Sequence, residues 1–84
     1  VMTTQKMYET VLAEFGFTMQ EGNFGMEPSL QLKNRRKGYI CFATFKVEPH
    51  KTLIRLGGCV NTGFIRVSEI QLRSLLTIIV QNYF

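Results

Sequence analysis

The strongest structural pattern in this chain is the segment YICFATFKV, residues 39–47. Aromatic and β-branched residues dominate it, as they do in β-strands. In a strand, one face would carry Tyr39, Cys41, Ala43, Phe45 and Val47, and the other would carry Ile40, Phe42 and Thr44. A strand that is apolar on both faces usually lies in the interior of a sheet and is covered on each side. We therefore expect residues 39–47 to form a central strand.

Shorter strands are predicted on both sides of this segment. Alternating or β-branched patterns predict strands over residues 17–20, 30–33, 52–60 and 64–67, separated by polar turns that contain Gly or Pro. Gly57 and Gly58 interrupt one of these strands, which indicates a bulge or a close approach of another backbone segment. The short turns favour an antiparallel meander of four to five strands.

Two helices flank the predicted strands. Thr3 or Thr4 can cap the first helix and Gly16 can end it. Ser68 and Gln71 form a capping-box pattern at the start of the second helix. The apolar stripes are Met7, Tyr8, Val11, Leu12 and Phe15 in the first helix, and Leu72, Leu75, Leu76, Ile79 and Tyr83 in the second.

The order of these elements predicts the fold class. An N-terminal helix, a run of strands and a C-terminal helix packed on the sheet make an α+β fold, and residues 1–84 form a single domain without linker or repeat. This order is similar to that of double-stranded-RNA-binding domains. The second helix, however, begins Ser68-Glu69-Ile70-Gln71 and lacks the Lys pair with which that family reaches across the groove. No family is assigned.

The charge of the chain is unevenly distributed. Residues 1–30 hold one Lys and four Glu, a net charge of −3, and residues 31–84 hold nine basic residues and two Glu, a net charge of +7. A basic half of this kind favours an anionic partner, nucleic acid first. The predicted nucleic-acid-binding residues are Lys33, Arg35, Arg36, Lys37, Tyr39, Lys46, Lys51, Arg55 and Arg66, with Phe64 as a further platform for base stacking.

Catalytic and metal-binding residues are scarce. The chain has no Asp and one His, His50, in a predicted turn, so a Ser-His-Asp arrangement is impossible. Cys41 and Cys59 with His50 would give at most three metal ligands, and a closed zinc site needs four. We expect a protein that is not an enzyme and that holds no cofactor or metal. Whether Cys41 and Cys59 face each other depends on a strand register that a slip of one residue would change.

A second hypothesis is a protein-interaction module, such as an adaptor, chaperone or inhibitor, that acts through the C-terminal helix and a sheet edge. This helix is apolar nearly all round, and one small sheet covers only one side of it, which favours a homodimer. The predicted interface residues are Leu75, Ile78, Ile79, Val80, Tyr83 and Phe84. The chain shows no hydrophobic leader and no apolar run of transmembrane length, so we expect a cytoplasmic protein without membrane contact.

Overall fold

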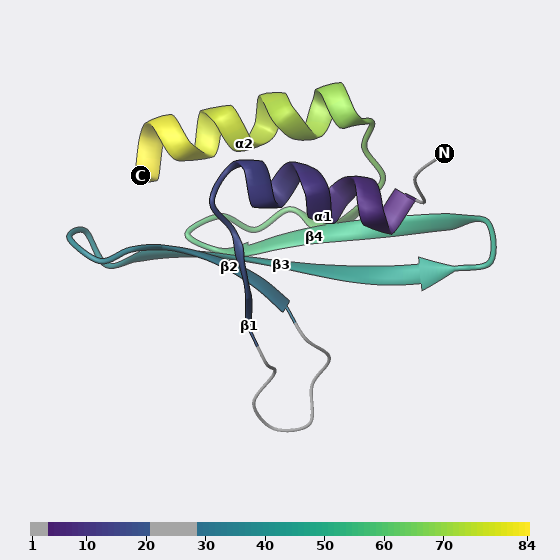
Figure 1. Cartoon of the computed structure of the whole chain (residues 1–84), viewed down its shortest axis with the longest axis horizontal. Helices are drawn as coiled ribbons and strands as arrows, with labels where there is room; N and C mark the ends of the chain where they lie inside the picture. Colours follow the sequence, from purple (N-terminus) through teal and green to yellow (C-terminus); the bar gives the residue numbers. More distant parts are fainter. Residues whose placement is uncertain (1–3, 21–28) are drawn as a thin grey trace.

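The computed structural model describes residues 4–20 and 29–84. In chain order its elements are α1 (Thr4–Glu14), β1 (Thr18–Gln20), β2 (Ser29–Asn34), β3 (Tyr39–Glu48), β4 (Lys51–Gly58), β5 (Gly63–Ile65) and α2 (Glu69–Tyr83) (Figure 1). The strands form one antiparallel sheet in the order β1-β2-β3-β4-β5, with β3 in the centre. The predicted α+β fold, the meander and the central strand are confirmed. The candidate cap Thr3 lies outside the described residues.

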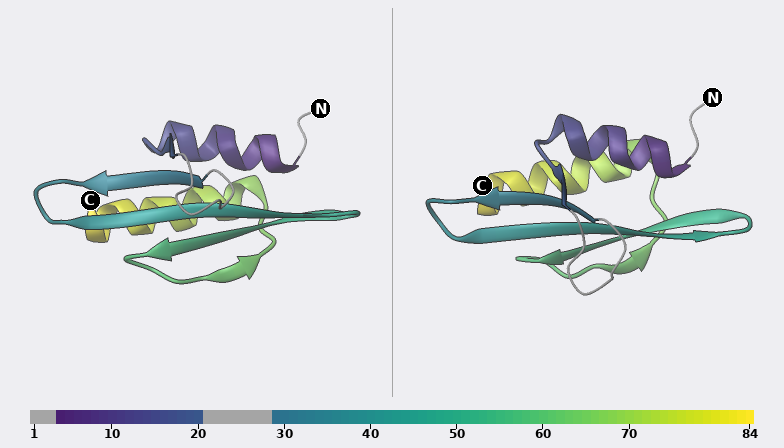
Figure 2. Two further views of the ribbon diagram at one scale, coloured as in Figure 1. Left: turned by 90° about the horizontal axis from the view of Figure 1, so that it is seen from below. Right: turned by 60° about the horizontal axis from the view of Figure 1, so that its bottom comes forward.

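Both helices pack on the same face of the sheet. Figures 1 and 2 show α1 and α2 side by side on one side of the strands, and the other face carries neither helix. The helix-bearing face of β3 includes Cys41 and Ala43, which are small and fully buried. Small side chains let a helix approach a sheet closely, while Phe42 points to the opposite face because side chains alternate along a strand.

The hydrophobic core lies between the helices and this face of the sheet. Both predicted helical stripes point into it: α1 buries Tyr8, Val11 and Leu12, and α2 buries Leu72, Leu76 and Ile79. The sheet side of the core consists of Phe17, Leu30, Cys41, Ala43, Ile54 and Leu56. Burial of a large aliphatic side chain contributes roughly 1.5–3 kcal/mol, so these facing layers are the main source of stability.

Tyr8 joins the helical layer to the sheet through its hydroxyl group. Its ring is fully buried and stacks on Phe45 at a centroid distance of 6.1 Å. The hydroxyl lies within donor distance of two carbonyl oxygens, Val67 O at 3.0 Å and Thr52 O at 3.3 Å. It also accepts a hydrogen bond from the backbone N–H of Val67 at 3.2 Å. A buried phenol is thus fully partnered, and it fixes the segment that leads into α2.

The predicted capping box at the start of α2 is confirmed. Gln71 N donates to Ser68 Oγ at 3.2 Å, and Ser68 N donates to Gln71 Oε1 at 2.9 Å. One turn further on, Arg73 forms ion pairs with Glu14 at the end of α1 and with Glu69 on α2, the latter at 3.0 Å. Arg73 therefore joins the two helices, and its charge is neutralised within the helical layer.

The hairpin of β3 and β4 contains the predicted irregularity at the glycine pair. Cys41 pairs with Gly58 rather than with Cys59, so the register is one residue away from facing cysteines. Gly58 has a φ of +98°, and a Cβ there would lie 2.2 Å from the carbonyl oxygen of Ile40. Only glycine fits this left-handed position. The next residue, Cys59, donates its N–H to Ile40 O at 2.7 Å.

Candidate nucleic-acid interface

The face of the sheet that bears no helix carries most of the predicted binding residues on strands. Ladder registers and side-chain alternation place on it Lys33 of β2, Ile40, Phe42, Thr44 and Lys46 of β3, Leu53, Arg55 and Gly57 of β4, and Phe64 of β5. We call this surface the open face. The left view of Figure 2 is taken from below and shows the strands in front of α2.

The open face is basic. Lys33, Lys46, Lys51 and Arg55 are exposed on it. Among the described residues, one acidic side chain shares this face, Glu48, which lies 3.7 Å from Lys46 and 3.6 Å from Lys51. These pairs are partly exposed, and such pairs contribute little energy. The positive charge at this end of the sheet is therefore reduced but not cancelled.

The turn between β2 and β3 presents the densest group of cations. Gly38 N donates to Asn34 O at 2.8 Å and closes the turn. The side-chain oxygen of Asn34 accepts from the N–H groups of Arg36 and Lys37, each at 3.1 Å. Arg35, Arg36 and Lys37 are exposed as a result, and the turn projects beyond the end of α2, at the left of Figure 1.

Tyr39 and Arg66 lie away from the open face, although both belong to the predicted binding set. The Tyr39 ring makes edge contacts with Tyr83 and Phe84 at centroid distances of 5.4 and 6.5 Å, on the helical side of the sheet. Arg66 follows β5 and lines a pocket of about 360 Å³ with Thr4 and other residues at the start of both helices. The other predicted binding residues lie on the open face or in the adjoining β2–β3 turn, and Tyr39 and Arg66 do not.

Phe42 is the open-face aromatic that was not among the predicted binding residues. It is 39% exposed, and Phe64 is 45% exposed. The guanidinium carbon of Arg55 lies 5.6 Å from the centre of the Phe64 ring, at cation–π distance. Side-chain alternation predicts that Phe42 and Cys41 point to different faces of the sheet. It does not predict which of the two faces the helices cover.

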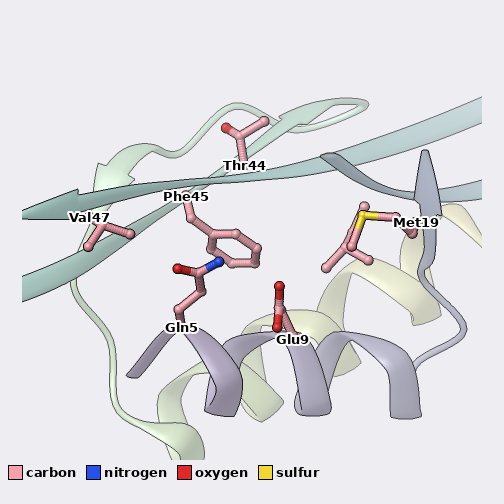
Figure 3. A pocket seen from close by; sticks show the side chains of 7 residues that line it. Gln5, Glu9, Met19, Thr44, Phe45 and Val47 are labelled. Carbon is pink, nitrogen blue, oxygen red and sulfur yellow. The ribbon is translucent and has the colours of Figure 1, made fainter. Parts of the chain in front are cut away.

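A pocket of about 520 Å³ lies on the helical side, beside β3. Gln5 and Glu9 of α1, Met19 of β1 and Leu30, Thr44, Phe45 and Val47 line it. Figure 3 shows the Phe45 ring directed toward Gln5 and Glu9, while Thr44 projects from the opposite face of β3. Among the described residues, Thr44 to Glu48 pair with β4 but with no strand on the other side. This part of β3 is a sheet edge next to an apolar pocket.

Cys41 and Cys59 are both free thiols, and they lie close together in spite of the shifted register. Burial raises the pKa of the Cys41 thiol to about 12, and the neighbouring Cys59 thiol adds to this increase. Gly58, the residue before Cys59, has a left-handed φ, and this departure from strand geometry lets the Cys59 side chain pack against the core beside Cys41. The alternation of side chains in the sequence does not predict whether Cys41 and Cys59 lie close together.

His50 is remote from both thiols. It lies in the turn between Glu48 and Lys51, and the β3 segment from Cys41 to this turn spans roughly 23 Å at the usual rise per residue. No cluster of three His, Cys, Asp or Glu side chains occurs in residues 4–20 and 29–84. Within the same residues no helix has the length and apolarity needed to cross a membrane.

Most of the predicted interface residues of α2 pack inside the protein. Ile79 is 2% exposed in the core, and Leu75, Val80, Tyr83 and Phe84 are partly buried against it. Ile78 is 56% exposed, and Ile70, which was not predicted, is 78% exposed. The apolar surface that α2 offers to a partner is therefore centred on these two isoleucines.

Comparisons of the chain with protein-family models, with curated proteins and with solved structures found no match.

Proposed function

We propose that this protein is a cytoplasmic, non-enzymatic binding protein whose partner is nucleic acid. The observation that carries the proposal is the charge of the open face and of the adjoining β2–β3 turn. Together they present seven basic residues, Lys33, Arg35, Arg36, Lys37, Lys46, Lys51 and Arg55, against Glu48 as the one acidic side chain among the described residues. Phosphate groups compensate such a surface and release condensed counterions when it binds, so the affinity should depend on salt.

The cations of the turn are the first to test. The triple variant Arg35→Ala, Arg36→Ala, Lys37→Ala removes three charges but keeps Asn34 and Gly38, which shape the turn. Fluorescence anisotropy with labelled DNA and RNA at several salt concentrations should show weaker binding for the variant. For a single strand, the slope of log K against log salt should fall by up to about 2, because each lost phosphate contact contributes roughly 0.7.

The matched control keeps the charge. Arg35→Lys with Arg36→Lys should bind with nearly the affinity of the parent protein, because phosphate attraction here requires charge rather than a particular fork geometry. Salt-independent binding, or a triple-Ala variant that binds as tightly as the parent, would contradict the proposed function.

A protein-interaction module is the second candidate, and the exposure of Ile70 and Ile78 favours it. Exposed apolar patches often mark partner surfaces, and the free edge of β3 could accept a further strand. A homodimer through α2 should appear in sedimentation experiments as a mass that rises with protein concentration. Ile78→Lys should then give a monomer, and a parent protein that sediments as a monomer at every concentration would exclude this dimer.

A further inference from the structure

The two exposed phenylalanines of the open face lie on different strands. Phe42 pairs with Gly57, and Phe64 pairs with Arg55, two residues earlier on the intervening strand β4. Two strand spacings across the sheet and two residues along it separate their backbones by roughly 12 Å. Exposure of a single Phe is ordinary, but two on one basic, helix-free surface need an explanation.

Packing of Phe42 over Gly57 would be the simplest structural role, since aromatic rings often cover cross-strand glycines. The geometry excludes this role. A Cβ built on Gly57 would have no heavy atom within 4 Å outside its immediate chain neighbours. The Phe42 ring does not lie over the glycine, and the space above Gly57 is open. This space adjoins Phe42 on one side and the Arg55–Phe64 pair on the other.

From this surface we infer that the ligand is a single nucleic-acid strand, with one base stacked on Phe42, another on Phe64, and the intervening chain passing over Gly57. The inference rests on the proposed nucleic-acid-binding function and specifies its substrate class. Aromatic side chains on a sheet can stack unpaired bases, whereas a duplex keeps its bases inside. Bases stacked on each other are about 3.4 Å apart, so two rings separated by roughly 12 Å require an unstacked, extended strand.

The cations fit the same path. Arg55 lies against one face of the Phe64 ring, so the base would stack on the other face, and the ladder pairing of Arg55 with Thr44 positions its charge between the two aromatic side chains. Lys33 lies diagonally opposite Phe42, because it pairs with Ile40. Phosphates that flank the two stacked bases would therefore meet one cation each. The aromatic rings provide the preference for unpaired bases, and the cations provide attraction to phosphates.

The test compares a fluorescein-labelled oligo(dT) of about 12 nucleotides with a duplex that has the same number of phosphates. The parent protein should bind the single strand more tightly. Phe42→Leu and Phe64→Leu should each weaken oligo(dT) binding about tenfold, since stacking of a base on an aromatic ring is worth that much, and they should leave the salt dependence unchanged. Met19→Ala, on the helix-bearing face of β1, is the control for removal of an exposed apolar side chain.

Gly57→Val separates binding from folding. Gly57 has no left-handed φ and open space around its Cβ position, so a valine fits the strand and fills the gap between the rings. This variant should keep or raise the urea midpoint of the parent while it loses at least about tenfold in affinity for oligo(dT), because a base can no longer reach its ring. It keeps the inference testable if Phe42→Leu fails to fold.

Each outcome has a definite meaning. If the parent binds duplex as tightly as oligo(dT), or if the Phe64→Leu and Gly57→Val variants bind oligo(dT) like the parent, the stacking inference is wrong. If binding is lost in the triple Ala variant of the turn but kept in these two variants, nucleic-acid binding stands without stacking. If no variant and no parent sample binds either probe at low salt, both proposals fail together.

Discussion

At the scale of single residues, the two cysteines show how burial controls reactivity. Cys41 is fully buried, and its pKa is raised to about 12, so it is a neutral thiol at physiological pH. Cys59 is only half-buried. Alkylation requires the thiolate and physical access, and Cys41 lacks both.

We therefore expect iodoacetamide at neutral pH to modify Cys59 first, and Cys41 only after unfolding in urea. Peptide mass spectrometry of samples taken over time identifies the modified residue. In the Cys59→Ser variant, which keeps the backbone, the remaining thiol should stay unmodified until urea is added. Equal rates at Cys41 and Cys59 in the native protein would show that the core around Cys41 opens readily.

At the scale of elements, the left-handed Gly58 allows β4 to approach the backbone of β3 closely at Ile40. Gly58→Ala would place a methyl group 2.2 Å from Ile40 O at a φ of +98°. Backbone strain at such a position costs on the order of 1–3 kcal/mol, and the clash with a backbone atom adds to it. Urea denaturation should show a lower midpoint, with a loss in the free energy of unfolding of at least about 2 kcal/mol.

The neighbouring glycine is the matched control. Gly57→Ala meets nothing within 4 Å and needs no unusual backbone conformation. It should be neutral or stabilising, by roughly 0.5–1 kcal/mol, because alanine loses less conformational freedom than glycine in a strand. Equal losses in both variants would contradict a special conformation at Gly58.

The elements themselves were largely predictable from the sequence, and their relative placement was not. The capping box of Ser68 and the core stripes of both helices follow from local spacing, which is why they are confirmed. Alternation separates Cys41 from Phe42 but does not choose which face receives the helices. β3 is apolar on both faces, so only the packing of α1 and α2 over the small Cys41 and Ala43 decides.

The candidate site shows the same limit. The cations of the β2–β3 turn were recognisable because they are adjacent in sequence. The grouping of Phe42, Gly57 and Phe64 on one surface was not recognisable from the sequence, because predicting it requires the pairing registers of three strands. Tyr39 borders the basic turn in sequence, yet its contacts with Tyr83 and Phe84 place it on the helical side. The predicted homodimer stays a prediction.

At the scale of the whole molecule, Arg73 links α2 to the end of α1 through Glu14. The hydrogen bond from Arg73 lowers the pKa of Glu14 below its ordinary value. A lowered carboxyl pKa means that the pair contributes fully above the ordinary value, and that its contribution is lost as pH falls through the lowered value. The contribution is small because both side chains are substantially exposed.

NMR titration of the Glu14 side-chain carbonyl should therefore give a midpoint below that of an unpaired glutamate. Arg73→Gln should move this midpoint upward, and it should move in the same direction at high salt because solvent-exposed ion pairs are screened. A Glu14 midpoint that is unaffected by Arg73→Gln would show that the two helices are not joined by this pair in solution.

The two layers of the molecule also differ in charge. The helices carry Lys6 and Arg73 against Glu9, Glu14 and Glu69, a net charge of −1, whereas residues 29–68 carry eight basic residues against Glu48, a net charge of +7. This separation gives the protein an electric dipole that runs from the helical layer to the sheet. In the electric field of a polyanion the molecule would rotate before contact so that its sheet faces the polyanion. A larger fraction of encounters would then be productive, which raises the association rate.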